Sequence, residues 1–200
     1  MTNNRNIAII GAALLLGGGV YMLLRRRGSS DLDNQPSLID EDVQQEIINM
    51  STNPNLPRGY RNNNPLNIRY SMWNAWKGKI VPNTDGTFEQ FKDMAYGYRA
   101  ALSLLRTYIK KYGCNTVAKI IQRWAPENEN NTQAYIQHVC EIANLLPNMA
   151  VTTTDRDTLT KMAYAMSIIE NGKTDKAGNS IQVTYGLPNM DIINEGWRLL

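Results

Sequence analysis

An uninterrupted apolar run near the start of the chain restricts its possible folds more than any other sequence feature. Residues 7–24 read IAIIGAALLLGGGVYMLL and contain no charged side chain. A run of this length can cross the hydrocarbon core of a bilayer as one helix. Three arginines follow it directly at positions 25–27, and only Arg5 precedes it. We therefore expect residues 1–27 to form a single transmembrane anchor that contacts the lipid bilayer through residues 7–24.

Two other interpretations of this run are weaker. A cleaved signal peptide would end in a site of the A-x-A type, and no such site closes the run. A buried core helix would not change abruptly from uncharged residues to three arginines, which are typical of contacts with lipid headgroups. The same arginines predict, through the positive-inside rule, that the rest of the chain faces the cytoplasm when it is synthesised.

The charged residues are unevenly distributed along the chain. The formal net charge is +3, but four of the 21 basic residues lie at or before residue 27, and all 18 acidic residues lie after it. Residues 28–56 contain six acidic and no basic residues, so they are predicted to be a solvated acidic tether. Residues 57–200 are long enough for one packed domain. Because residues 28–200 contain 17 basic and 18 acidic residues, we expect no binding to nucleic acid.

The domain is predicted to be mainly helical. Residues 93–112 repeat apolar side chains at helical spacing, and a glycine follows at position 113, as is common after a helix. Further helices are predicted over residues 115–124, 132–146 and 155–171. Between residues 60 and 91, aromatic side chains lie among turn residues without a clear period, so we expect a small irregular or β-hairpin lobe.

One carboxylate interrupts an apolar helix face. Leu159, Met162, Ala163 and Met166 share one stripe of the last predicted helix, and Glu170 follows on the same stripe. Partial burial and the negative end of the helix dipole both disfavour the charged form of a carboxylate at this position. The protonated form is the one that a general acid needs in order to cleave a glycosidic bond. The alternative is a solvated glutamate at a helix end.

The loop after Pro126 carries rival carboxylates. Glu129 is the second candidate for an acid or base, with Glu127 beside it, although either side chain could simply face water.

A polar segment suggests a carbohydrate-binding surface. Side-chain amides can hydrogen-bond sugar hydroxyls and N-acetyl groups, and aromatic rings can cover the apolar faces of sugars. The candidate substrate-binding residues are Asn62, Asn63, Asn64, Asn67, Tyr70, Trp76 and Trp124, with Tyr60 and Trp73 as further candidate platforms. The alternative is that the asparagines cap loops and that several of the rings lie in the core.

Several motifs in one order resemble a family of bacteriophage virion-associated proteins. They are RGYRNNNPLNIRY, W-x-G beginning at Trp76, TFEQF, YGYRAALSLLRTYIKKYG, CNTVAKIIQRWAPENENNTQAYIQHV and MSIIENG, and the resemblance covers about residues 58–190. Members are described as phage structural proteins or virion lysins with a lysozyme-like, transglycosylase-type domain. Leu66 stands where the family usually has glycine, and Ile169 where it usually has histidine. The asparagine block also resembles the region after the catalytic glutamate in flagellar-type glucosaminidases, whereas here E-N-G follows the block.

The resemblance implies a lytic transglycosylase carried by the virion that opens the cell wall during genome entry. Glu170 would be its acid and base, and its expected partners are peptidoglycan glycan strands and, in the particle, capsid or other virion membrane proteins. The protein would lie in the virion membrane, after a single-pass stage in the host cytoplasmic membrane. No metal or cofactor is expected, since His138 is the only histidine.

Two other functions remain open. The first is a non-catalytic virion membrane structural protein that binds glycan or capsid. The second is a host enzyme that remodels the wall in the periplasm, which requires the opposite membrane topology.

Overall fold

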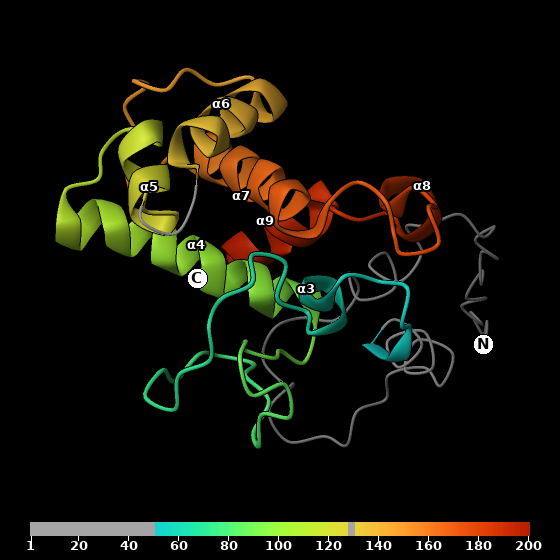
Figure 1. The fold of residues 1–200 in the computed structure, drawn as a ribbon. Helices are drawn as coiled ribbons and strands as arrows, with labels where there is room; N and C mark the ends of the chain where they lie inside the picture. Colours follow the sequence, from blue (N-terminus) through green and yellow to red (C-terminus); the bar gives the residue numbers. More distant parts are fainter. Residues whose placement is uncertain (1–50, 128–130) are drawn as a thin grey trace, which may run out of the picture.

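The structure, a computed structural model, describes residues 51–127 and 131–200 (Figure 1). Within these residues the regular elements are helices, with the bounds α3 (Arg58–Arg61), α4 (Met94–Tyr112), α5 (Val117–Trp124), α6 (Thr132–Ala143), α7 (Arg156–Asn171), α8 (Ile181–Tyr185) and α9 (Met190–Arg198). The described part of the chain is therefore mainly helical.

The two longest helices, α4 and α7, each begin after a capping aspartate and end before a glycine. The side chain of Asp93 accepts hydrogen bonds from two backbone N–H groups in the first turn of α4, and Gly113 ends the helix with a left-handed φ of 66°. The side chain of Asp155 caps α7 by accepting from the N–H of Thr158, and Gly172 follows the last residue of the helix with a φ of 77°. These ends confirm the helices predicted from the sequence.

The two helices between them differ from the prediction at one end each. Helix α5 is capped by the hydroxyl of Thr116, whereas the sequence predicts Asn115 as the cap, so it begins one residue later than expected. Helix α6 ends at Ala143 and not at residue 146, because Asn144 adopts a left-handed conformation with a φ of 52°. Asparagine enters this region more readily than most residues, which explains the early end.

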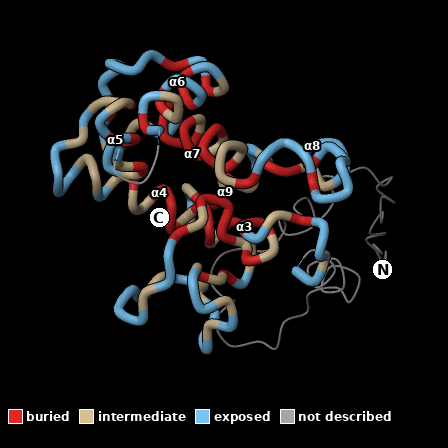
Figure 2. Tube along the Cα trace, in the orientation of Figure 1, coloured by how far each residue is buried: buried red, intermediate tan, exposed pale blue. Residues whose placement is uncertain are grey.

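The core lies where α4, α7 and α9 meet. Helix α9 packs along α4, and α7 contacts both of them as well as α6. Figure 2 shows buried residues gathered on the facing sides of these helices. Leu159, Met162, Ala163 and Met166 of α7 are each 0% exposed, which confirms the predicted apolar stripe. Glu170 therefore follows a face that is packed into the core.

Residues 62–92 form a lobe on one side of α4 (Figure 1). Among the described residues of this lobe there are only isolated antiparallel bridges, from Arg69 to Phe88 and from Lys79 to Phe91. The β-hairpin alternative was therefore wrong, and the lobe is irregular. Side-chain hydrogen bonds, and not a β-ladder of backbone hydrogen bonds, hold the turn at residues 83–86. The side chain of Asn83 accepts a hydrogen bond from the N–H of Gly86 over 2.7 Å.

The predicted fold class needs a second correction, at its membrane anchor. None of the helices within residues 51–127 and 131–200 is both long and apolar enough to cross a bilayer. The apolar run 7–24 and most of the predicted tether lie outside the described residues. Leu56, the last residue assigned to the tether, is fully buried, so packing begins before residue 57.

Candidate functional site

The candidate site is built on a loop of four asparagines, residues 62–67, which we call the asparagine loop. Asn63 and Asn67 have φ angles of 51° and 49°, in the left-handed region. Asparagine adopts this conformation more readily than other residues with a Cβ atom. The two left-handed residues turn the chain on either side of Pro65 and bring Asn67 against the C-terminal end of α7.

Three of the asparagines use their amides inside the protein. Asn64 is fully buried, and its Nδ2 donates to the carbonyl oxygens of Ile68 and Glu89 over 2.9 and 3.0 Å. Asn63 Nδ2 donates to the carbonyl oxygen of Phe91 over 3.1 Å. Asn62 is buried as well, and its Nδ2 donates to Asp85 on the lobe. These contacts favour the loop-capping interpretation for Asn62, Asn63 and Asn64.

Asn67 joins the loop to Glu170. Its Nδ2 lies 3.2 Å from Oε2 of Glu170 and 3.2 Å from the carbonyl oxygen of the same residue. Next in the chain, Asn171 donates to the carbonyl oxygen of Pro65 over 2.7 Å. Gly59 lies below this junction, where a Cβ atom would approach Asn67 Oδ1 to 2.7 Å and collide with Asn171. The E-N-G sequence is thus the place where the end of α7 meets the asparagine loop.

The carboxylate of Glu170 is held from two further helices. Trp124 Nε1 at the end of α5 donates to Oε1 over 3.1 Å, and the Tyr135 hydroxyl on α6 donates to the same oxygen over 2.9 Å. Both oxygens of this half-buried side chain therefore accept hydrogen bonds from neutral donors. Three donors from three separate segments fix the carboxylate in position.

Tyr135 is a site residue that sequence reasoning missed. Burial raises the pKa of its hydroxyl well above the ordinary value, and the charge of Glu170 raises it further. The hydroxyl therefore stays protonated and available as a donor across the physiological pH range. The only signal in the sequence was a tyrosine beside the core-facing Ile136, which does not reveal a contact with a residue 35 positions away.

Glu170 opens into a pocket of about 760 Å³ between the lobe and the helices. We call this the Glu170 pocket. Its walls come from both sides: Asn67, Ile68, Arg69 and Phe88 from the lobe side, and Leu104, Tyr108, Trp124 and Ala125 from the helical side. The rings of Tyr108 and Trp124 lie 6.5 Å apart and are tilted by 56°. A partly apolar pocket with a few fixed polar groups is typical of a ligand site.

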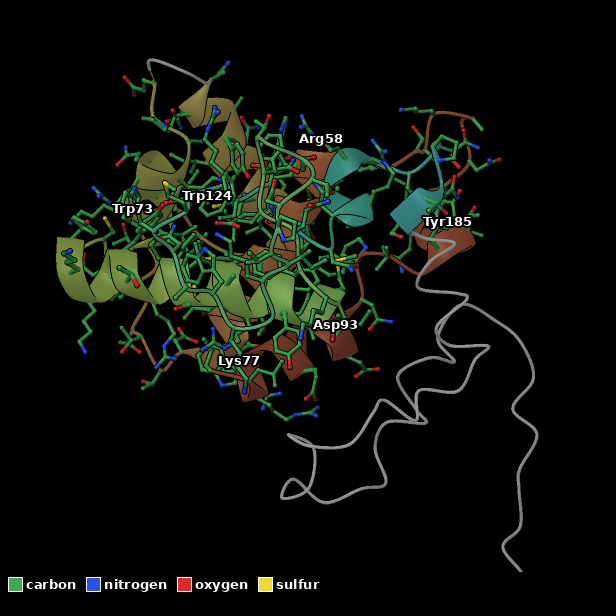
Figure 3. The ribbon with its side chains drawn as sticks, turned by 90° about the horizontal axis from the view of Figure 1, so that it is seen from below. Arg58, Trp73, Lys77, Asp93, Trp124 and Tyr185 are labelled. Atoms are coloured by element: carbon green, nitrogen blue, oxygen red, sulfur yellow. The ribbon has the colours of Figure 1, made fainter. Side chains whose placement is uncertain are left out.

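The structure separates the other predicted aromatic residues from this pocket. Tyr60 is 1% exposed and belongs to the core, so it was wrong as a sugar platform. Trp76 packs against the core, while Tyr70 is partly exposed and lies under the ammonium of Lys79, 4.7 Å from ring centre to Nζ. Trp73 is 87% exposed; Figure 3 places it and Trp124 toward the C-terminal end of α4.

Of the two rival acids in the loop after Pro126, Glu127 lies within the described residues and Glu129 does not. Glu127 is exposed and does not line the Glu170 pocket. Glu129 lies outside the described residues, so its candidacy stays a prediction. A third acid, Glu89, is fully buried, and its Oε2 pairs with Nζ of Lys79 over 3.0 Å.

The described part of the chain contains no group of three His, Cys, Asp or Glu side chains arranged as a metal site. Cys114 and Cys140 are both free thiols.

Comparison with known proteins gives one informative relative. No protein-family model matches the chain. Protein P5 of Pseudoalteromonas phage PM2 is 41% identical to it over 117 residues, which is 58% of this chain and 71% of that protein. The similarity therefore covers most of the length of a phage protein.

Proposed function

The chain belongs to the family of protein P5 of Pseudoalteromonas phage PM2, and from this relationship and the Glu170 pocket we propose that it is a virion protein that cleaves peptidoglycan glycan strands. In this proposal Glu170 is the single general acid and base of a lytic transglycosylase. The phage relative supports the viral setting, and the pocket supports the chemistry.

The observation that carries the proposal is the environment of the Glu170 carboxylate. It lies on the wall of an open pocket, and the hydrogen bonds that it accepts from described residues come from the neutral groups of Asn67, Trp124 and Tyr135. Within residues 51–127 and 131–200, no lysine or arginine forms an ion pair with it. A carboxylate without a permanent cationic partner can gain and lose a proton during a reaction, whereas an ion-paired one is held in its charged form.

The number of acids in the pocket favours transglycosylation over hydrolysis. Hydrolytic glycosidases normally place two carboxylates on opposite sides of the scissile bond. Among the described residues that line the Glu170 pocket, Glu170 is the only acidic one. A lytic transglycosylase needs one such group, because the sugar supplies its own nucleophile.

The proposed reaction uses Glu170 twice. It first gives its proton to the glycosidic oxygen, and the bond from this oxygen to C1 of the muramic residue breaks. The carboxylate then takes the proton of the C6 hydroxyl of the same sugar while that oxygen bonds to C1, which closes an anhydro ring and restores the acid. Tyr135 and Trp124 hold the carboxylate during both steps, and no water is consumed.

The two aromatic rings support a sugar as the ligand. Tyr108 and Trp124 present apolar surface next to the carboxylate, and sugars bind through one apolar ring face together with polar hydroxyls at the edge. Asn67 and Arg69 supply polar groups on the opposite wall.

The test is cleavage of purified peptidoglycan by the full chain and its Glu170→Gln variant. Glutamine keeps the size of the side chain and an acceptor for Trp124 but cannot donate and recover an acidic proton. We expect the rate to fall by about 10²–10⁴-fold, the usual contribution of general acid–base catalysis, with an unchanged circular dichroism spectrum.

Two further variants complete the test. Glu141→Gln makes the same change at an exposed position of α6 and should cleave like the wild type. Glu129→Gln examines the rival acid. Loss of cleavage in Glu129→Gln together with full activity in Glu170→Gln would contradict the assignment, and a wild-type chain that binds peptidoglycan without cutting it would favour the non-catalytic alternative.

A further inference from the structure

A second pocket lies beside the Glu170 pocket and is strongly basic. From residue 94 to residue 126 the sequence contains six basic and no acidic residues. Four of the six, Lys110, Lys111, Lys119 and Arg123, fall in the last turn of α4 and on α5, where Figure 1 shows the two helices joined at one end of the molecule. This end of the fold therefore carries a cluster of positive charge, and the first acidic residue after it is Glu127, directly after Pro126.

The pocket at this end has a volume of about 690 Å³, and we call it the α4–α5 pocket. Tyr112, Lys119, Gln122 and Arg123 contribute to its walls. Tyr108 lines both this pocket and the Glu170 pocket, so the two share a wall. A ligand that occupied the Glu170 pocket could extend past Tyr108 into the α4–α5 pocket.

Arg123 is held in a geometry suited to a carboxylate. Its guanidinium carbon lies 3.4 Å from the ring centre of Tyr112 and 5.3 Å from that of Tyr108. Stacking occupies the faces of the planar guanidinium but leaves the N–H groups at its edge free to donate. Arg123 is exposed, and within the described residues no carboxylate pairs with it. A planar fork of this kind binds carboxylates in a bidentate manner.

We propose that the α4–α5 pocket binds the free carboxylates of the peptide stems that peptidoglycan carries on its muramic residues. This inference rests on the proposed function, because it assumes that a glycan strand occupies the Glu170 pocket. A stem attached to a sugar in that pocket would reach past Tyr108 to Arg123 and Lys119. The site would thus distinguish wall that still carries stems from bare glycan.

The small number of cations in the wall of the α4–α5 pocket favours a stem over nucleic acid. Nucleic-acid surfaces spread Lys and Arg along a face or helix to follow the repeating phosphates. Here two cations, Lys119 and Arg123, contribute to the pocket wall, which suits an isolated carboxylate group.

The experiment measures binding, so it does not depend on cleavage. The full chain carrying Glu170→Gln is titrated into soluble fluorescent glycan strands, one set with stems and one set freed of stems by an amidase. Adding Arg123→Gln should weaken binding to the strands with stems by about tenfold or more, the loss expected for a charge-assisted hydrogen bond. Binding to the stem-free strands should change by less than about twofold.

The matched control is Lys176→Gln, which removes the same charge from an exposed position in the loop before α8, at the opposite end of the molecule from α5 (Figure 1). It should leave both titrations unchanged. Equal weakening on both kinds of strand, or none on either, would overturn the proposal, as would a dependence on Arg123 seen with double-stranded DNA and not with stems. If the wild type fails to cleave but the stem-dependent difference appears, the proposed function fails and this inference stands.

Discussion

Two glutamates contact the asparagine loop, and their surroundings differ. Glu89 lies on the lobe side, is fully buried, and pairs with Lys79, which is itself 8% exposed. Its backbone carbonyl accepts from Asn64. Glu170 lies on the helical side, opens into the Glu170 pocket, and accepts from Asn67, Trp124 and Tyr135. In the part of the chain that the structure describes, no lysine or arginine pairs with it. The carboxylate of Glu89 is paired with a cation and buried, whereas the carboxylate of Glu170 is oriented by hydrogen bonds and remains accessible from the pocket.

This difference suits Glu89 to a structural role and Glu170 to proton transfer. A buried ion pair contributes little net stability compared with an apolar pair, but losing one partner is costly because the other charge stays buried. A carboxylate fixed by neutral donors keeps its capacity to exchange a proton. We therefore expect changes at Glu89 to alter folding and changes at Glu170 to alter cleavage.

The largest effect on folding is expected for Glu89→Gln. The ammonium of Lys79 would keep only neutral partners, such as the carbonyl oxygens of Ser71 and Asn74, inside the lobe. We expect the free energy of unfolding in urea to fall by about 3–5 kcal/mol.

The control for this variant is the exposed Glu141→Gln, which should change stability by less than about 0.5 kcal/mol. Adding Lys79→Met to Glu89→Gln should restore much of the loss, since it removes the unpaired charge. An unchanged stability of Glu89→Gln would mean that the pair does not hold the lobe.

A smaller effect, on cleavage, is expected for Tyr135→Phe. The ring stays in place, but one of the two hydrogen bonds to Oε1 of Glu170 is lost. We expect cleavage to slow by about tenfold, corresponding to the roughly 1.5 kcal/mol of a hydrogen bond to a charged group. Tyr164→Phe removes a hydroxyl on α7 that faces Gln182 instead, and it should cleave at the wild-type rate. Equal rates for the two variants would show that Tyr135 does not position the carboxylate.

The smallest effect is a pH dependence of stability that belongs to the lobe and not to the pocket. Burial opposes the charge of Asp85, but hydrogen bonds from Arg58, Asn62 and two backbone N–H groups outweigh it and hold the pKa of Asp85 below its ordinary value. Because the folded state binds the proton more weakly, the stabilisation is complete above the unfolded pKa of about 3.9 and is lost as the pH falls toward the lower folded value.

Urea unfolding at several pH values checks this contribution. Asp85→Asn should be less stable than the wild type at pH 7, and the difference should shrink steadily as the pH falls below about 4. A difference that stays constant with pH would contradict the assignment.

Four of the described helices, α4 to α7, were predictable because each has a cap and an apolar stripe. The position of Glu170 on the buried stripe of α7 followed from the same spacing. Helix α9 was missed, although Asn189 caps it and Asp191 lies in its first turn. The lobe could not be assigned from periodicity, since side chains and not a strand ladder hold it together.

The site was less predictable than the fold. The residue types of the asparagine loop did not reveal which amides point inward, because this depends on the left-handed backbone at Asn63 and Asn67. Trp124 was selected as a ring that stacks on sugars, whereas its N–H also orients Glu170. The Tyr135 contact arises only when α6 packs on α7, and no local pattern indicates it.

The most direct test of the central claim is mass spectrometry of the sugar fragments released from peptidoglycan by the full chain. If Glu170 is the single acid and base of a transglycosylase, the wild type releases fragments ending in anhydro-muramic residues, and Glu170→Gln releases none above background. Fragments with ordinary reducing ends, or anhydro ends released by Glu170→Gln at the wild-type rate, would contradict the claim.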